Sequence, residues 1–215
     1  MLVTEAPAET GQRATLEQKL EQAGYVDVAK LDGSIVVSLM YARPDNFVGE
    51  IMYTDLNRAF LHPEAADAVV KAQKELHKIN PEYNLKICDA SRPMSVQRRM
   101  YDKVRGTSQA RYVSNPARGG GLHNYGLAVD VTIVDRDGNE LPMGTPVDHL
   151  GPESNIDRED ILVASGKITK ENRNNRLLLR IVMQAGGFKP LKSEWWHFNL
   201  RTRAQAKARY KLINF

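Results

Sequence analysis

The stretch that decides the fold is Gly121-Leu-His123-Asn-Tyr-Gly126-Leu-Ala-Val-Asp130-Val-Thr-Ile133. After Gly126, apolar side chains alternate with small or polar ones, and this period of two predicts a β-strand with one face in the core. Asp130 belongs to the opposite face, so we expect it to point toward a cleft or solvent. Gly126 permits a sharp bend before the strand, which lets His123 fold back toward it. An imidazole and a carboxylate are therefore predicted to lie close together.

Helical and strand patterns surround this strand without the regular alternation of a βαβ fold. We predict a single domain of the α+β class, with a mainly antiparallel sheet and flanking helices. The segment 106–122 has no periodicity and is predicted to be a loop, and Asp137-Gly138 predicts a hairpin turn. Five helices are predicted: one that begins at a capping box at 15–18, one that begins at Pro63, and others over 93–104, 169–185 and 202–211. The helix over 169–185 is expected to bury Leu177, Leu178, Ile181 and Val182. Strands are predicted over 34–41, 84–88 and 195–200.

The composition is that of an ordinary globular protein. The chain has 215 residues, 42% of them hydrophobic, and a net charge of +4, which excludes a collagen, a coiled coil and wholesale disorder. No apolar run approaches the ~18 residues that a membrane span needs, so no membrane insertion is expected. Cys88 is the single cysteine, which excludes an internal disulfide.

Residues 1–14 are polar and without periodicity, and we expect a flexible arm there, followed by one domain over 15–215. The arm lacks the apolar region of a signal peptide. Two locations stay open: the cytoplasm, or the periplasm or cell envelope if a targeting segment has been removed.

The C-terminal stretch is basic, but its alanines are interleaved with the charges. This spacing is typical of a solvated amphipathic helix, and no dense basic patch of the kind that binds nucleic acid is evident. We therefore expect no nucleic-acid partner. The residues concerned are Arg201, Arg203, Lys207, Arg209 and Lys211.

Two imidazoles and one carboxylate, with a fourth position open to water, form the ligand set of a catalytic zinc. The second imidazole is expected from His197 in the stretch Glu194-Trp-Trp-His197. The odd spacing of Glu194 and His197 places their side chains on opposite faces of a straight strand, so a shared ion requires a turn or bulge near Trp195. A carboxylate beside the metal could then accept a proton from water. The alternative is that these residues are a surface histidine, packing tryptophans and a solvated glutamate, and each segment taken alone favours this alternative.

Arg92 lies in the stretch Asp89-Ala-Ser-Arg92-Pro93, between a predicted strand and a predicted helix. Its permanent charge could stabilise the oxyanion formed when a carbonyl is attacked. The alternative is an arginine at a helix start that pairs with Asp89 on the surface.

The joint pattern resembles the VanX-type D-alanyl-D-alanine dipeptidases. These belong to the wider group of zinc D,D- and L,D-carboxypeptidases acting on peptidoglycan peptides. The elements that carry the resemblance are H-x6-D, E-x-x-H and S-R-P, together with the stretches 41–47 (YARPDNF), 142–144 (PMG) before Asp148, and Gly187-Phe188 before the E-x-x-H element. They extend from about residue 24 to residue 200.

The resemblance implies a zinc site in a cleft, with one Zn²⁺ per chain, and hydrolysis of D-Ala-D-Ala or a closely related dipeptide by zinc-activated water. Two alternatives stay open: a D,D- or L,D-carboxypeptidase that trims longer peptidoglycan peptides, and a non-catalytic peptidoglycan-binding module, against which the intact residue set argues. Gly121 occupies a position where the family usually has serine, so a hydroxyl is absent from the expected pocket. The implied roles are zinc ligands for His123, Asp130 and His197, catalytic base for Glu194, transition-state stabilisation for Arg92, and substrate binding for Tyr41, Asp148, Gly121 and Trp195.

Overall fold

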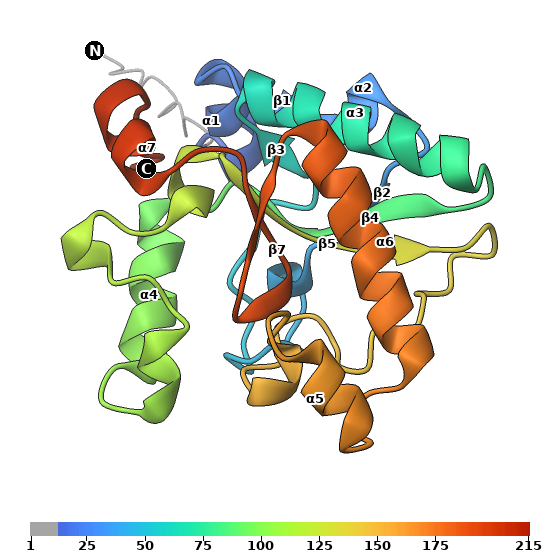
Figure 1. Ribbon diagram of the computed structural model, residues 1–215. Helices are drawn as coiled ribbons and strands as arrows, with labels where there is room; N and C mark the ends of the chain where they lie inside the picture. Colours follow the sequence, from blue (N-terminus) through green and yellow to red (C-terminus); the bar gives the residue numbers. More distant parts are fainter. Residues whose placement is uncertain (1–12) are drawn as a thin grey trace, which may run out of the picture.

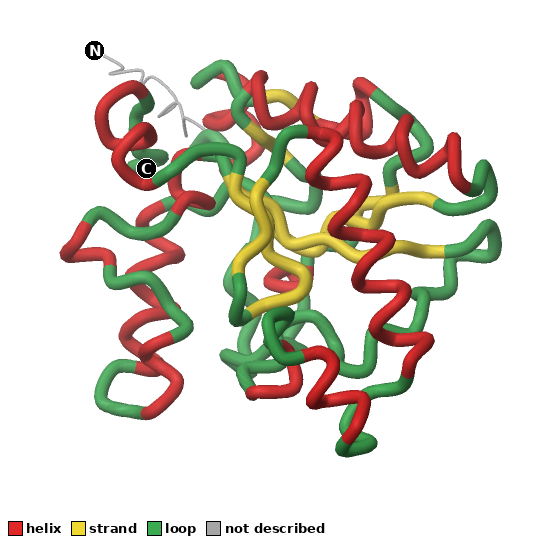
Figure 2. Tube along the Cα trace, in the orientation of Figure 1, coloured by secondary structure: helices red, strands yellow, loops and turns green. Residues whose placement is uncertain are grey.

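The computed structural model describes residues 13–215 (Figure 1), so the arm expected over 1–14 lies outside the described residues apart from its last two. A five-stranded sheet with the order β2-β4-β5-β7-β6 forms the centre of a single α+β domain (Figure 2). β2 is parallel to β4, and the other three pairs are antiparallel, which confirms the predicted fold class. The strands are β2 (Val36–Val37), β4 (Asn84–Asp89), β5 (Ala128–Val134), β6 (Lys189–Leu191) and β7 (Glu194–Asn199).

The other elements surround this sheet. β1 and β3 form a separate antiparallel pair. All five predicted helices begin within one residue of their predicted start, and α6 ends one residue later than predicted. Among the described residues, no helix is long and apolar enough to cross a membrane. The remaining elements are β1 (Val26–Asp27), β3 (Phe60–Leu61), α1 (Leu16–Gln22), α2 (Val28–Leu31), α3 (Pro63–Ile79), α4 (Met94–Val104), α5 (Glu159–Ala164), α6 (Lys170–Gly186) and α7 (Arg203–Arg209), with short 3₁₀ turns at Met40–Ala42, Ser108–Arg111, Pro116–Arg118, Leu122–Tyr125 and Pro152–Ser154.

The core lies between the sheet and two long helices. α3 and α6 pack against each other and cover one face of the sheet (Figure 1). They approach closely at Gly186, where a Cβ atom would lie 2.5 Å from the carbonyl oxygen of Ala68. Every residue of β5 is buried, including Asp130. The face expected to border a cleft or solvent is therefore covered by the loops that build the site.

The strand predicted over 34–41 is shorter than expected. Only Val36–Val37 pairs, and the chain then turns through Met40–Ala42. The carbonyl of Tyr41 accepts hydrogen bonds from the backbone N–H groups of Met52 (2.8 Å) and Tyr53 (2.9 Å). These long-range contacts override the local β preference.

The apolar stripe of α6 was assigned partly to the wrong face. Leu177 and Ile181 are 44% and 49% exposed, whereas Leu179, Val182 and Met183 are fully buried. The reason is that α6 rests on α3 through the side that contains Gly186, where the two backbones come closest. Strand β6 carried no periodic signal, because three residues are too few to show one.

Candidate active site

The sheet register aligns three polar residues across three neighbouring strands. Asp89 on β4 lies opposite Asp130 on β5, after a bulge that begins at Ile87. Asp130 in turn pairs with His197 on β7. Since directly opposed residues of antiparallel strands point to the same face, the three side chains form one row.

His123 reaches this row from the 3₁₀ turn at Leu122–Tyr125. Gly126 ends the turn with a φ of +66°, a left-handed conformation that favours glycine. A side chain there would also collide with the backbone nitrogen of His62, 2.8 Å from the Cβ position. The bend expected from the sequence is present, and the backbone N–H of Arg92 donates to the His123 carbonyl at 3.0 Å.

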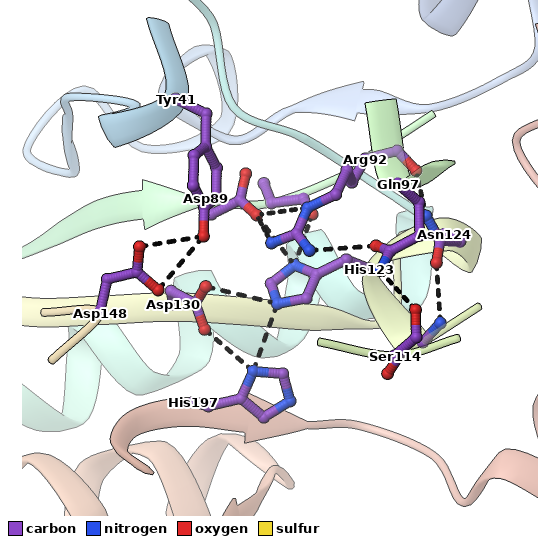
Figure 3. A network of polar contacts seen from close by, with 12 residues as sticks. Tyr41, Asp89, Arg92, Gln97, Ser114, His123, Asn124, Asp130, Asp148 and His197 are labelled. Carbon is purple, nitrogen blue, oxygen red and sulfur yellow. Dashed lines mark hydrogen bonds and ion pairs between the residues drawn. The ribbon is translucent and has the colours of Figure 1, made fainter. Parts of the chain in front are cut away.

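His123, Asp130 and His197 form a compact cluster (Figure 3). His123 Nε2 lies 3.2 Å from His197 Nδ1 and 3.4 Å from Asp130 Oδ2, and His197 Nδ1 lies 2.9 Å from Asp130 Oδ1. All three candidate ligand atoms lie within 4.8 Å of one another. They are close enough to bind a single ion.

In each imidazole, the nitrogen that faces away from the cluster, which we call the outer nitrogen, has a hydrogen-bond acceptor. This acceptor determines the tautomer of the ring. His123 Nδ1 donates to the carbonyl oxygen of Ala90 at 2.7 Å, and His197 Nε2 donates to Asn199 Oδ1 at 2.9 Å. Because carbonyl and amide oxygens only accept, both outer nitrogens hold their protons. His123 Nε2 and His197 Nδ1 therefore direct their lone pairs to the cluster, as metal-binding histidines do.

The charges of the cluster are strongly coupled. Burial opposes ionisation of Asp130, but the two imidazoles outweigh it and hold the pKa of this carboxyl below its usual range. Burial likewise opposes a charge on His197, yet the Asp130 carboxylate, which accepts a hydrogen bond from the protonated ring, raises the pKa of His197 to about 9. Asp130 and the two imidazoles therefore stabilise a cation between them, either a proton or a metal ion.

Glu194 comes to the same site through a bulge. The β6–β7 register shifts so that Pro190 pairs with Phe198 whereas Leu191 pairs with Glu194. The straight-strand geometry is thereby broken, and Glu194 Oε2 lies 3.8 Å from His197 Nδ1. Burial raises the pKa of the Glu194 carboxyl above its ordinary value, which suits a group that takes up and returns a proton.

Arg92 is buried, and its pairing with Asp89 takes place inside the protein (Figure 3). Nε and Nη2 donate to Asp89 Oδ2, and Nη1 donates to Gln97 Oε1 at 3.1 Å. These bonds use three of the five N–H donors of a guanidinium. Burial disfavours the charge, but Asp89 more than compensates and raises the pKa of Arg92.

Sequence reasoning noted Asp89 only as a surface partner and missed Gln97. Asp89 is fully buried and also accepts from the Tyr53 hydroxyl at 2.7 Å. Its place two residues before the S-R-P element was a usable signal for its role. Gln97 gave none, since it lies on an ordinary helix.

Tyr41 and Asp148 face each other on the other side of the cluster (Figure 3). The Tyr41 hydroxyl lies 3.2 Å from both carboxylate oxygens of Asp148, and the Arg92 guanidinium stacks over the Tyr41 ring at 5.0 Å. Asp148 is the one non-glycine residue of the described chain with a positive φ, +69°, a conformation that is costly outside glycine. Burial, with the charge of Asp130, raises the pKa of the Asp148 carboxyl well above its usual range.

Gly121 and Trp195 differ in how they relate to the cavity. Gly121 lies in its wall, and the Oγ of Ser114 lies 2.8 Å from where a Cβ of residue 121 would be. Trp195 is 1% exposed, and its indole N–H donates to Thr145 Oγ1 at 2.8 Å. The structure thus places Trp195 in the core, because the bulge directs its neighbour Trp196 to the cavity wall instead.

The cluster borders a cavity of about 430 Å³, whose wall also contains Tyr41, Arg92, Gly121, Asp148 and Glu194 but neither Asp89 nor Trp195. The donor set of the cluster fits zinc: two imidazole nitrogens and one carboxylate oxygen, with outer hydrogen bonds that orient both rings. Three protein ligands are the number typical of catalytic zinc sites, which keep a position for water or substrate. The cavity borders this cluster, so a small substrate can reach it.

Comparisons with known proteins agree with this chemistry. The model of the family Peptidase M15, described as D-Ala-D-Ala dipeptidase, matches residues 21–214. A D-alanyl-D-alanine dipeptidase of Escherichia coli (strain K12) is 32% identical over 175 residues, covering 81% of this chain and 83% of that protein. One from Enterococcus faecium is 29% identical over 181 residues, covering 75% and 83%.

Among solved structures, one titled as that of the LdcB LD-carboxypeptidase aligns with a TM-score of 0.42 and 21% identity, covering 69% of this chain and 63% of the other. The family match spans nearly all of the described residues and includes every member of the cluster. This chain therefore belongs to the Peptidase M15 family of D-Ala-D-Ala dipeptidases, which are metallopeptidases.

Proposed function

We propose that this protein is a zinc dipeptidase that hydrolyses D-Ala-D-Ala or a closely related dipeptide, with one zinc ion per chain held by His123, Asp130 and His197. The observation that carries the choice of a dipeptide is the Asp148 carboxylate in the cavity wall. Its one hydrogen-bond partner among the described residues is the Tyr41 hydroxyl. A free ammonium group on the substrate supplies the positive charge that this partly buried carboxylate lacks.

When bound, the zinc ion supplies Lewis-acid activation of the carbonyl and of water. Glu194 takes the proton from the attacking water at its carboxylate and later delivers it to the nitrogen of the leaving amine. The two N–H donors of Arg92 that Asp89 and Gln97 leave free stabilise the negative oxygen of the tetrahedral transition state. Asp89 and Gln97 hold the guanidinium in place for this task.

Substrate length distinguishes this function from the alternative, a D,D- or L,D-carboxypeptidase acting on longer peptides. An acylated or longer peptide has no ammonium for Asp148, and an unpaired buried group costs about 1–3 kcal/mol. That cost corresponds to at least about fivefold weaker transition-state binding.

The test is to incubate the zinc-loaded protein with D-Ala-D-Ala, with N-acetyl-D-Ala-D-Ala and with a pentapeptide that ends in D-Ala-D-Ala, and to measure released D-alanine. Because the group left unpaired is a carboxylate, and charged groups cost more than the lower bound, we expect kcat/KM for the free dipeptide to exceed that for the acetylated one at least about tenfold. His123→Ala is the inactive control. Equal kcat/KM values for the three peptides support the carboxypeptidase instead.

A further inference from the structure

A second cavity of about 470 Å³ adjoins the one that borders the cluster of His123, Asp130 and His197. The two share part of their walls, including Ser114, Glu194 and Arg203. The second cavity lies between the 106–122 segment and the turn that joins β6 to β7. Because Glu194 borders both, a group bound in the second cavity is a direct neighbour of the reacting bond.

Three arginines border this second cavity, which we call the arginine-lined cavity: Arg111, Arg118 and Arg203. None of these three arginines forms an ion pair with a carboxylate of the described residues. Most of the other arginines that make polar contacts in the described part of the chain form such a pair. Arg203 donates to the carbonyl of Gly120, and Arg111 donates to the Tyr112 hydroxyl at 3.2 Å. The one acidic residue in the wall is Glu194, so the cavity carries an uncompensated positive charge.

The direction of the substrate follows from the proposed function, on which this inference rests. Asp148 binds the ammonium, and Figure 3 shows Asp148 and Ser114 on opposite sides of His123. A dipeptide with its carbonyl at the cluster therefore extends its second residue toward Ser114. That residue enters the region where the two cavities meet.

Gly121 widens this junction. A side chain at position 121 would lie 2.8 Å from Ser114 Oγ and 3.2 Å from Ser114 Cβ. Because residue 121 is glycine, the Ser114 hydroxyl lies where a side chain of residue 121 would be. Within the described chain this hydroxyl has no hydrogen-bond partner. It is available to a polar group of the second residue.

We propose that the arginine-lined cavity binds an anionic side chain on the second residue of the substrate, so that dipeptides such as D-Ala-D-Glu are preferred over neutral ones. Each exposed ion pair contributes up to about fivefold in affinity. Salt screens exposed charges, so the preference decreases as ionic strength rises.

The experiment compares D-Ala-D-Glu with D-Ala-D-Gln, which has the same shape and the same α-carboxylate but no side-chain charge. We expect kcat/KM to be at least about fivefold higher for D-Ala-D-Glu at low salt. Arg111→Gln with Arg118→Gln should reduce this ratio to below about twofold and leave D-Ala-D-Ala turnover within about twofold. Arg158→Gln, an exposed arginine outside both cavities, is the matched control and should retain the full preference.

Binding provides a second measurement. Calorimetry on zinc-loaded Glu194→Gln, which turns substrate over slowly, should give a lower Kd for D-Ala-D-Glu than for D-Ala-D-Gln. If all dipeptides are cleaved without preference for D-Ala-D-Glu, or if the arginine variants impair both peptides equally, this inference is wrong and the proposed function stands. If none is cleaved but the arginine-dependent binding preference persists, the proposed function is wrong and this inference stands. If no dipeptide is cleaved and no arginine-dependent binding preference is measured, the proposed function and this inference are both wrong.

Discussion

At the scale of single residues, the cluster is a place where lone pairs converge. His123 Nε2, His197 Nδ1 and the Asp130 carboxylate lie within hydrogen-bond distance or little more of one another. Without a cation between them, these lone pairs repel. Zinc binding and protonation therefore compete for the same atoms, which makes metal affinity decrease on acidification.

The hydrogen bond from His197 to Asn199 is expected to tune this affinity. Asn199→Leu removes the acceptor that keeps the proton on Nε2 of His197, and loss of such a partner costs about 10–100-fold in metal affinity. Competition with a chromophoric chelator measures the effect. His197→Ala, which removes the ligand itself, should abolish stoichiometric zinc binding. An unchanged zinc affinity in Asn199→Leu would show that Nδ1 of His197 is not the ligand atom.

Glu194 is expected to act on protons without holding the metal. Glu194→Gln keeps the size of the side chain but replaces a basic oxygen by an amide nitrogen, so turnover should fall by at least about 10²–10⁴-fold. Zinc content measured by atomic absorption should stay at the wild-type level. Loss of zinc from this variant would contradict the division of roles between Glu194 and His197.

At the scale of elements, two irregularities build the site. The β6–β7 bulge brings Glu194 to the side of His197, which the odd spacing of the two residues forbids in a regular strand. The β4 bulge before Asp89 sets this residue opposite Asp130. Bulges often redirect side chains next to active sites.

The crossing of α3 and α6 is expected to tolerate no side chain at Gly186. In Gly186→Ala, the added Cβ would lie 2.5 Å from the Ala68 carbonyl oxygen, so the helices must move apart. Overpacking of this kind costs about 1–3 kcal/mol of unfolding free energy, more than the roughly 1 kcal/mol that alanine gains in helix propensity. Urea unfolding measures the difference. Gly33→Ala, where the Cβ position is open, is the control and should change stability by less than about 0.5 kcal/mol.

At the scale of the whole molecule, the buried thiol of Cys88 is expected to make the free energy of unfolding depend on pH under alkaline conditions. Cys88 lies in β4 between two neighbouring strands and is 5% exposed. Burial raises the pKa of this thiol far above its usual value. The folded protein therefore keeps the proton at a pH where the unfolded chain has lost it.

Stability should consequently fall as the pH rises above about 8.5, the ordinary thiol pKa. There the unfolded state binds fewer protons than the native state, so the unfolding free energy declines by up to about 1.4 kcal/mol per pH unit for this group. Urea midpoints between pH 7.5 and 9.5 test this in the wild type and in Cys88→Ala. Cys88→Ala should have a lower urea midpoint at pH 7.5, because it loses buried volume, but its midpoint should decrease less steeply with pH than that of the wild type. Parallel profiles would assign the alkaline loss to other groups.

The sequence by itself determined those features that depend on neighbouring residues. The capping box at Thr15 and Gln18, the helix start at Pro63 and the pattern that predicts strand β5 all lie in short windows, and the structure has the capping box, the helix and the strand. The family resemblance rested on ordered motifs, and the family match confirms it. The bend at Gly126 was readable for the same reason, since a glycine before a strand is a local signal.

Only the tertiary structure decided what meets across the sheet. The row of Asp89, Asp130 and His197 depends on strand register and on two bulges, and register is a long-range property that a sequence window does not contain. The turn at Tyr41 forms because distant backbone groups bond its carbonyl. Whether an apolar side chain is buried, as in α6, depends on which face the neighbouring helix covers. The same holds for Ser114 beside Gly121: two residues of one loop become neighbours in the cavity only when the chain has folded around it.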